Sequence, residues 1–387
     1  MSTLPTAYIV AARRTALGRI GGLHRNRRLE DLAAPVIEAA LKDARIAPER
    51  VEEFVLGNTT AGGNPARVVA LATGLPEVAA AITLDRQCSS GLDAILAAHR
   101  AVAFGGADVV VAGGAESLST APWRIAKPRS LYQMPHFIGI EPPGADAADE
   151  PQMFEASEGL ARKLGLNRVA QDAYAIKSHQ RASRAREARR FVGEIVPLRA
   201  NADEARDQSV ADVDLDAVAE ETPFLPPDGT LTPANTSALH DGAAFAVVVS
   251  ERVWQELGKP PALRLVAAVA QGVAPSEEAA APIAAAQKLY GRINGFDRAL
   301  IRAVETSESS AAQAIALGNA LGLGDDVLNA DGGAIARGHP LGASGAVLVV
   351  RLFSRMLRAK DKDAPRAGVA VQGAIGGLGI AALLERA

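Results

Sequence analysis

An internal repeat of strand and helix patterns most limits what this chain can fold into. Buried-strand patterns alternate with stretches of helical apolar spacing, and one order of elements occurs in residues 7–117 and again in residues 263–379. Each copy has a strand, a helix, a strand ending in a turn, a second helix, a polar elbow, a third helix and a strand entering a glycine-rich turn. This alternation predicts parallel sheets covered by helices, and the repeat predicts two halves related by a pseudo-twofold axis.

The two polar elbows are expected to meet at the centre of the molecule. The first holds Cys88, the only cysteine of 387 residues, between an apolar run over 79–82 and an apolar-periodic segment over 92–102. The second holds His339, ahead of a predicted helix over 346–357. A thiol at a helix start is easier to ionise, because unpaired N–H groups and the helix dipole place positive charge there. A buried core thiol is the alternative, and this stretch alone leaves both open.

The segment between the two copies breaks the pattern and predicts an inserted lid. Residues 118–235 contain a proline-rich stretch, a helix that Asn167 caps and that runs to Arg190, and an acidic irregular run over 201–221. Long irregular insertions in compact proteins are often functional. The predicted domains are a first half of residues 1–117 plus 236–260, a lid of residues 118–235, and a second half of residues 261–387.

Composition excludes several classes of function. The net charge of −3 offers no electrostatic case for binding nucleic acid or an anionic membrane. A single cysteine excludes an internal disulfide framework and a cysteine-based metal site, and no other metal site is expected. The sequence begins without a signal-peptide pattern and has no apolar run of membrane-spanning length, so we expect a cytoplasmic protein.

Motifs along nearly the whole chain resemble those of the thiolases, at the intervals expected of that family. They are residues 12–18, 57–58, 64–67, 74–76, 88–91, 112–117, 235–237, 241–243 and 329–345. The most specific is Gly-His-Pro-Leu-Gly-Ala-Ser-Gly over 338–345. The resemblance implies an α/β protein with the five-layered α-β-α-β-α fold: two pseudo-equivalent halves and an inserted lid that holds coenzyme A.

The resemblance also implies roles for individual residues. Cys88 would carry the acyl group as a thioester, and His339 would activate Cys88 and help to hold the thioester oxygen of the second substrate. Ser237 would contact the pantetheine arm of coenzyme A, and Met153 would line the pocket. The backbone N–H of Cys88, with one from the turn over 373–377, would form an oxyanion hole.

Two turns depart from the thiolase pattern. Residues 307–310 read Ser-Glu-Ser-Ser where the family has Asn-Glu-Ala-Phe, so Ser307 replaces the asparagine that holds a water at the oxyanion hole. In the last turn, Gly373 replaces the family's second cysteine and Ile375 replaces a glycine. That cysteine is the acid/base of the carbon–carbon step, and such groups contribute about 10²–10⁴ in rate. We therefore expect this step to be impaired or to use another base.

Three residues are candidates for the replacement base: Glu308, then His240, then His136. For Glu308, a structural carboxylate is the preferred interpretation. The sequence thus predicts an acyltransferase with acyl-CoA as substrate and no permanently bound cofactor, assembled as a homodimer or homotetramer. The alternative is a degenerate, non-catalytic thiolase homologue that binds CoA thioesters or serves as a partner subunit.

Overall fold

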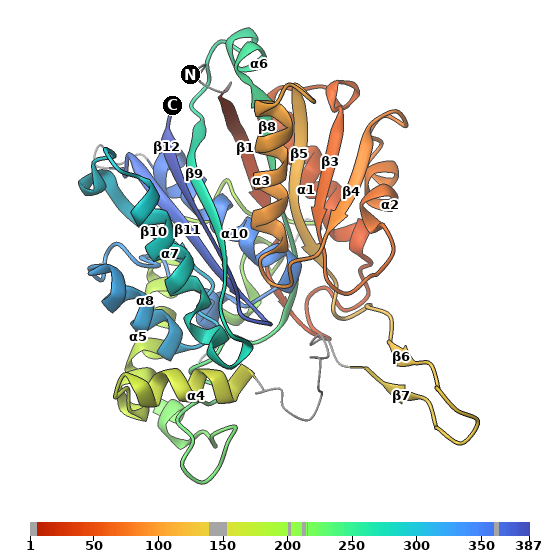
Figure 1. Cartoon of the computed structure of the whole chain (residues 1–387). Helices are drawn as coiled ribbons and strands as arrows, with labels where there is room; N and C mark the ends of the chain where they lie inside the picture. Colours follow the sequence, from red (N-terminus) through yellow and green to blue (C-terminus); the bar gives the residue numbers. More distant parts are fainter. Residues whose placement is uncertain (1–5, 139–152, 200–202, 211–213, 215, 360–363) are drawn as a thin grey trace.

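The computed structural model describes residues 6–138, 153–199, 203–210, 214, 216–359 and 364–387. Within them, ten strands form one large sheet through the molecule (Figure 1). The strands are β1 (Ala7–Arg14), β2 (Gly18–Arg19), β3 (Glu53–Gly57), β4 (Ala80–Leu84), β5 (Val109–Glu116), β8 (His240–Ser250), β9 (Leu263–Gly272), β10 (Ile301–Thr306), β11 (Ala367–Ala374) and β12 (Leu378–Arg386). A separate two-stranded ribbon consists of β6 (Ile125–Ala126) and β7 (His136–Phe137).

The strand order shows the predicted relation between the two halves. It runs β10-β11-β12-β9-β1-β8-β5-β3-β4, with β2 beside β8. Strands β1 and β9 are neighbours at the centre of the sheet. Outward from them, the order is β8, β5, β3 on one side and β12, β11, β10 on the other. The first two pairings on each side are antiparallel and the third is parallel. Within the described residues, β9, β12, β11 and β10 therefore correspond to β1, β8, β5 and β3, whereas β2 and β4 have no counterparts.

The predicted parallel pairing holds for only part of the sheet, because the sheet is mixed. The neighbours β3–β4, β3–β5 and β10–β11 are parallel, whereas β8 and β12 run antiparallel to the strands on both sides of them. A three-residue turn joins β11 to β12, and so short a connection can join only antiparallel strands. The repeat pattern had ended at that turn, so it did not include β12.

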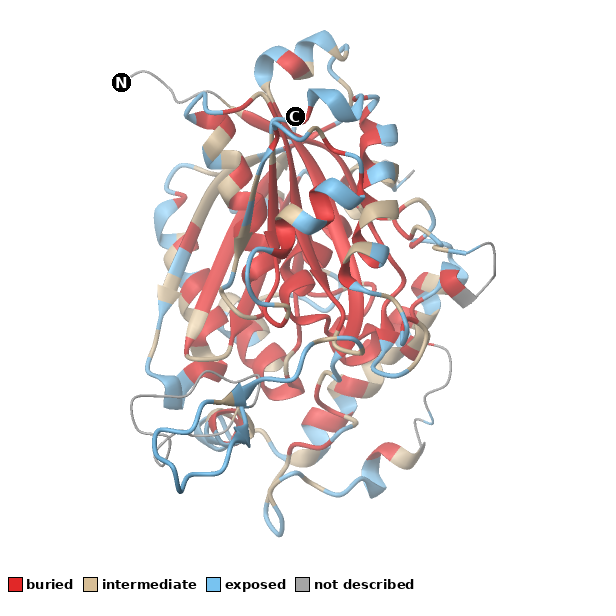
Figure 2. Ribbon diagram, turned by 90° about the vertical axis from the view of Figure 1, so that its right-hand side faces the viewer, coloured by how far each residue is buried: buried red, intermediate tan, exposed pale blue. Residues whose placement is uncertain are grey.

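Helices cover both outer faces and also fill the space between the halves. They are α1 (Leu29–Ala44), α2 (Pro65–Ala72), α3 (Ser90–Ala103), α4 (Met153–Lys163), α5 (Arg168–Glu187), α6 (Glu251–Glu256), α7 (Ala281–Arg292), α8 (Ala311–Leu321), α9 (Ala334–Arg337) and α10 (Leu341–Phe353). One apolar core lies under α1 and α2, another under α7 and α8, and a third surrounds α3 and α10 between the strands of the two halves. Figure 2 shows the buried residues along the strands and these central helices.

Helices α3 and α10 cross so closely that glycine is required at the contact. A Cβ atom on Gly91 would lie 2.6 Å from the carbonyl oxygen of Gly342 and 2.9 Å from the backbone nitrogen of Ala346. A Cβ atom on Gly345 would lie 2.6 Å from the backbone nitrogen of Leu92. Because backbone atoms cannot move aside as a flexible side chain can, these glycines set the separation of the helices and hold their first turns together.

The lid is joined to the core through buried ion pairs. Arg14 of β1 pairs with Glu194 at 2.8 Å and with Asp207 at 2.6 Å, and both carboxylates come from the lid segment. Arg351 of α10 also pairs with Glu194, at 2.5 Å, and with Asp331. All five side chains are buried. Removing one partner from such a group typically costs about 3–5 kcal/mol, so these pairs fix the lid on the core.

Other parts of the lid surround the core with helices and an extended arm. Asn167 caps α5 as predicted, since its side chain accepts a hydrogen bond from the Ala170 N–H at 2.9 Å. Helix α4 packs against α8 and against the short helix η5 (Pro275–Ala280). The β6–β7 ribbon projects from the body (Figure 1). Every helix in the described ranges is too short or too polar to span a bilayer.

The close crossing of α3 and α10 gives a stability prediction. Gly91→Ala would place a methyl group against backbone and should lower the free energy of unfolding by at least the 1–3 kcal/mol typical of overpacking, as measured by urea denaturation. The matched control is Gly291→Ala in α7, where a Cβ atom meets nothing within 4 Å and alanine should be neutral or stabilising. Equal stability of the two variants would contradict this account of the crossing.

Candidate active site

Cys88 lies in a tight elbow between β4 and α3. Gln87, just before it, adopts a left-handed conformation with φ of 50°. The Ser90 hydroxyl closes the turn: it donates to the Gln87 carbonyl at 2.6 Å and accepts from the Arg86 N–H at 2.7 Å. Cys88 is only 5% exposed, and Ser89 is fully buried. The elbow is therefore closed in this structure.

His339 lies in the matching elbow, directly before α10. Its ring nitrogen Nδ1 is 2.8 Å from the Ser344 hydroxyl, one turn into the helix. Its backbone N–H donates to the Ala238 carbonyl at 3.0 Å, and its carbonyl accepts from the His240 N–H at 3.1 Å. Both the ring and the backbone are thus held. Since Ser344 binds Nδ1, Nε2 is the nitrogen left to act on a substrate or thiol.

The fold brings the two elbows together, as the repeat predicted. Cys88 packs against Leu341, which lies two residues after His339, and against Ala374 at the end of β11. A Cβ atom on Gly114 of β5 would lie 2.2 Å from the Gly342 carbonyl oxygen, so this strand also touches the second elbow. Among the described residues no direct hydrogen bond joins the Cys88 sulfur to the His339 ring.

Burial controls the protonation of both side chains. It raises the pKa of Cys88 to about 12, although the backbone N–H groups of Ile375 and of Cys88 itself lower it. The expectation of an easily ionised thiol was therefore wrong for this closed elbow, since loss of water outweighs the nearby N–H groups. Burial also lowers the pKa of His339 to about 4. At neutral pH the site holds a neutral thiol and a neutral imidazole that can accept a proton.

The last glycine-rich turn, residues 375–377, lies against the Cys88 elbow. The Ile375 N–H is within hydrogen-bonding reach of the Cys88 sulfur. The next N–H along the chain, that of Gly376, donates to Oε2 of Glu278 at 2.9 Å. One turn therefore presents successive N–H groups to the thiol and to a carboxylate from η5. Glu278 could not be identified from the sequence, because no motif marks the segment 273–280.

Gly373, at the position of the family's second cysteine, has little space beside it. A Cβ atom there would lie 3.1 Å from Cδ of Pro282 and 3.4 Å from Nε2 of Gln313. The neighbouring Gln372 is fully buried and donates to the Ser307 hydroxyl at 3.0 Å. The same Gln372 amide also donates to the Gly373 carbonyl at 2.8 Å, so Ser307 lies close to Gly373. Gln372 was not predicted as a site residue from the sequence, although a glutamine within an otherwise apolar strand could have marked it.

Glu308 is a fully engaged carboxylate. Its two oxygens accept hydrogen bonds from the Tyr174 hydroxyl at 2.9 Å, the Ser178 hydroxyl at 2.8 Å, the Asn329 amide at 2.7 Å and the Ile335 N–H at 3.3 Å. These donors come from the lid helix α5 and from the segment leading to His339. Glu308 therefore ties three segments together, an arrangement typical of a structural carboxylate and unfavourable for a base.

The two histidines considered as replacement bases lie in other surroundings. Both ring nitrogens of His240 are engaged, Nε2 with the Ser209 hydroxyl at 2.7 Å and Nδ1 with the Ala238 carbonyl at 2.9 Å. His136 is exposed on β7 of the projecting ribbon (Figure 1). Neither arrangement favours a role at the Cys88 sulfur.

Ser237 and Met153 lie on elements that border the site. The Ser237 N–H donates to the Ser309 carbonyl at 3.2 Å, and Leu239 pairs with His339 through the backbone. The segment 237–239 thus runs from the Ser307 turn to the His339 elbow. Met153 begins α4, the helix that packs on η5 and α8, and both Ser237 and Met153 are half-buried.

A buried carboxylate at the end of β5 also positions the second elbow. Glu116 accepts hydrogen bonds from the Gly342 N–H at 3.0 Å, the Asn58 amide at 2.7 Å and the Thr59 N–H at 3.1 Å. Burial raises the pKa of this carboxyl group, although the hydrogen bonds lower it. Glu116 fixes the first turn of α10 beside β3 and β5. From the sequence, Glu116 was noted only as part of the thiolase-like motif over residues 112–117.

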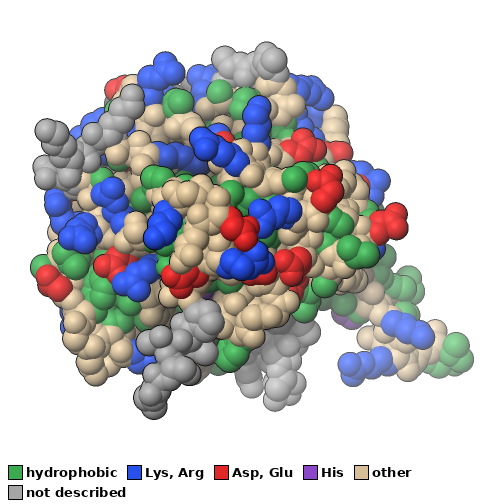
Figure 3. Space-filling view, turned by 90° about the horizontal axis from the view of Figure 1, so that it is seen from above, with side chains coloured by type: hydrophobic (Ala, Val, Ile, Leu, Met, Phe, Trp, Pro, Cys, Tyr) green, Lys and Arg blue, Asp and Glu red, His purple; other side chains and the backbone are tan. Residues whose placement is uncertain are grey.

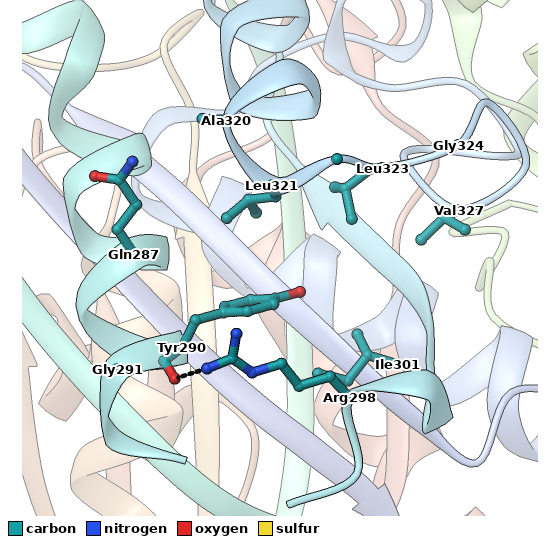
Figure 4. A pocket seen from close by; sticks show the side chains of 11 residues that line it. Gln287, Tyr290, Gly291, Arg298, Ile301, Ala320, Leu321, Leu323, Gly324 and Val327 are labelled. Atoms are coloured by element: carbon teal, nitrogen blue, oxygen red, sulfur yellow. Dashed lines mark hydrogen bonds between the residues drawn. The ribbon is translucent and has the colours of Figure 1, made fainter. Parts of the chain in front are cut away.

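The described residues also form a cavity apart from the predicted site residues. A cavity of about 560 Å³ lies between α7, α8 and β10 (Figure 4), where the Arg298 guanidinium lies 5.2 Å from the Tyr290 ring centroid and donates to the Tyr290 carbonyl. None of the predicted site residues lines it. On the face in Figure 3, basic and acidic side chains are intermingled.

Comparison with known proteins gives matches along the whole chain. Two family models match it: Thiolase, N-terminal domain, over residues 7–252, and Thiolase, C-terminal domain, over residues 259–386. An acetyl-CoA acetyltransferase of Chromobacterium violaceum is 35% identical, covering 98% of this chain and 99% of the relative. A putative acetyl-CoA C-acetyltransferase of Staphylococcus epidermidis is 36% identical over 98% of both chains. The crystal structure of the Bacillus anthracis acetyl-CoA acetyltransferase superimposes with a TM-score of 0.92 at 30% identity, covering 100% of both chains.

The buried imidazole of His339 predicts a pH dependence of stability. Its folded pKa of about 4 lies below the value near 6.5 of an unfolded chain, so between these values only the unfolded state binds the proton. The free energy of unfolding should therefore fall as pH drops from 7 to 5, with a His339 contribution on the order of 2 kcal/mol. Urea denaturation at several pH values should show that the free energy of unfolding depends less on pH in His339→Asn than in wild type. A His339 ring that titrates near pH 6.5 by NMR would contradict this prediction.

Proposed function

The chain belongs to the thiolase family, and on that premise we propose that it is an acyltransferase that carries the acyl group of an acyl-CoA on Cys88. The observation that best supports this is the meeting of three turns at Cys88. The Ile375 N–H approaches the Cys88 sulfur, and Leu341 packs on Cys88 from the elbow that carries His339. A nucleophile, a base and an oxyanion donor thus come from three turns that α3, α10 and β11 hold in place.

Acylation begins from the neutral pair. The Cys88 sulfur attacks the thioester carbon of the acyl-CoA as its proton passes to Nε2 of His339, for which the low pKa of the imidazole leaves a free electron pair at neutral pH. The N–H groups of Cys88 and Ile375 stabilise the oxyanion of the tetrahedral intermediate. The carbon–sulfur bond to coenzyme A then breaks, and the CoA sulfur leaves with the proton from His339.

The remaining predicted residues take supporting roles in this proposal. Ser237 and Met153 would contact the pantetheine arm of coenzyme A. Ser307 would hold a water near the oxyanion hole, with its hydroxyl oriented by Gln372. Coenzyme A acts as substrate, no permanently bound cofactor is required, and the cytoplasmic location stays a prediction. The carbon–carbon step cannot use a thiol at Gly373, so it is impaired or uses a base other than cysteine.

A non-catalytic homologue is the second candidate function. It is favoured by Gly373 and Ser307, which replace family catalytic residues, and by the closed elbow with its high thiol pKa. A protein of this kind would bind coenzyme A without forming an adduct. Calorimetric binding of coenzyme A together with an unmodified Cys88 after incubation with acyl-CoA would select this candidate.

Incubation with acetyl-CoA, followed by intact mass spectrometry, tests the acyl-enzyme. The wild-type chain should gain one acetyl group and Cys88→Ala none, and His339→Asn should slow the gain by about 10²–10⁴ because the proton acceptor is lost. His136→Asn is the matched control and should acylate at the wild-type rate, since this histidine lies on the projecting ribbon. Failure of the wild type to form an adduct with any of several acyl-CoAs would reject the acyl-enzyme.

Two surfaces support the proposed homodimer or homotetramer. Strand β4 is the outer strand of the sheet in the described residues, and Ile82 on it is 45% exposed. An exposed strand edge can pair with a second copy of the same strand. The arm around β6 and β7 exposes a group of large apolar side chains, which marks an interaction surface. They are Trp123, Ile125, Leu131, Tyr132, Met134 and Phe137.

Sedimentation velocity tests the role of the arm. If the arm joins copies of the chain, the double variant Leu131→Ser/Tyr132→Ser should sediment as a smaller species than wild type, because both side chains are almost fully exposed. Val169→Ser is the control, since it removes another exposed apolar side chain outside the arm. An unchanged assembly in the double variant would show that the arm does not join subunits.

A further inference from the structure

We propose that Glu278 is the acid/base of the carbon–carbon step, taking the proton from the α-carbon of the second acyl-CoA. The inference rests on the proposed acyl-enzyme at Cys88 and assigns the role that Gly373 cannot fill. It comes from the position of one carboxylate relative to the last turn and the thiol.

The carboxylate and the thiol share one turn. Oε2 of Glu278 accepts the Gly376 N–H at 2.9 Å, and the adjacent Ile375 N–H approaches the Cys88 sulfur. The Cα atoms of neighbouring residues are about 3.8 Å apart, so the two groups lie over neighbouring peptide units. An acyl group on the sulfur would therefore form beside the turn that holds this carboxylate, where the α-carbon of a second thioester must also come.

Backbone contacts hold Glu278 in this position. The Val273 N–H donates to the Gly377 carbonyl at 2.8 Å, and a Cβ atom on Gly377 would lie 2.4 Å from the Val273 carbonyl oxygen. Further along, a Cβ atom on Gly379 would lie 2.2 Å from the carbonyl oxygen of Ala281. The segment 273–281 is thus fixed against the last turn on both sides of Glu278. This rigidity is what a catalytic carboxylate needs, because small displacements cost rate.

Burial distinguishes Glu278 from the neighbouring acid. Glu278 is 8% exposed, and its charge is among the causes that raise the pKa of Cys88, so the two groups interact electrostatically. The side chain of Glu277 is 60% exposed and reaches Lys163 of α4 at 3.7 Å across the surface. Two successive carboxylates on one short helix therefore differ in direction, and only Glu278 turns toward the site.

The proposed step conserves atoms and electrons. A lone pair of the Glu278 carboxylate takes a proton from the α-carbon of the second acyl-CoA, and the C–H electron pair passes into the thioester as an enolate. The enolate carbon attacks the acyl carbon on Cys88 and forms the new carbon–carbon bond. The bond from that carbon to the Cys88 sulfur breaks, its electron pair leaves on the sulfur, and the thiolate takes the proton held by Glu278. No oxidant or metal ion enters the step.

The experiment follows acylation and proton removal separately in the full-length protein. Intact mass spectrometry reports the acetyl group on Cys88, and incubation with acetyl-CoA in D₂O reports exchange at the α-carbon by NMR. The variants are Glu278→Gln, whose amide oxygen can still accept the Gly376 N–H, and Glu278→Asp, which keeps a carboxylate. Glu277→Gln is the matched control on the same helix.

Wild type and Glu277→Gln should both form the adduct and exchange the α-proton. Glu278→Gln should form the adduct within a few-fold of wild type but lose about 10²–10⁴ in exchange, and Glu278→Asp should exchange faster than Glu278→Gln. Unchanged exchange in Glu278→Gln, or a wild-type adduct without exchange, would overturn the proposal. Loss of both signals in Glu278→Gln would also overturn it, because Glu278 would then only position the turn. Exchange that falls in Glu278→Gln, without any wild-type adduct, would instead reject the acyl-enzyme and support Glu278 only as the group that takes the α-proton.

Discussion

The crossing of α3 and α10 at glycine backbone is the constraint on which the rest of the structure depends. Gly91 and Gly345 let the two helices approach until backbone meets backbone, which side chains would prevent. Each helix begins directly after a polar elbow, so the contact also sets the separation of Cys88 from His339. The large sheet supports this pair from both sides, and buried ion pairs of Arg14 and Arg351 join the lid to the same elements.

The chemistry of the site follows from its closure. Excluding water keeps the Cys88 thiol and the His339 imidazole neutral, so the proposed reaction moves a proton during attack instead of starting from an ion pair. Closure also strengthens the N–H groups of the last turn as oxyanion donors, because they act in a medium of low dielectric constant. In our proposal this turn serves both halves of the reaction, with Ile375 at the acyl group and Gly376 holding Glu278.

Much of the architecture could be predicted from the sequence, because apolar spacing and the repeat are local signals. The predicted helix over 346–357 overlaps α10, and Asn167 caps α5 as its residue type suggests. The antiparallel β12 was missed because it lies beyond the repeated pattern. A lowered pKa was expected for the Cys88 thiol, because a sequence shows where a helix begins but not how deeply a residue is buried. Glu278 and Gln372 were missed because only the folded chain brings η5 and β11 to the elbow.

The measurement that tests this account most directly is a crystal structure of the protein after incubation with acetyl-CoA. The account predicts an acetyl group on the Cys88 sulfur, with its carbonyl oxygen within hydrogen-bonding distance of the Ile375 N–H and the His339 ring facing the sulfur. A second bound acetyl-CoA should place its α-carbon toward Glu278. Coenzyme A bound in the site, with Cys88 unmodified and the thioester directed away from it, would contradict the account.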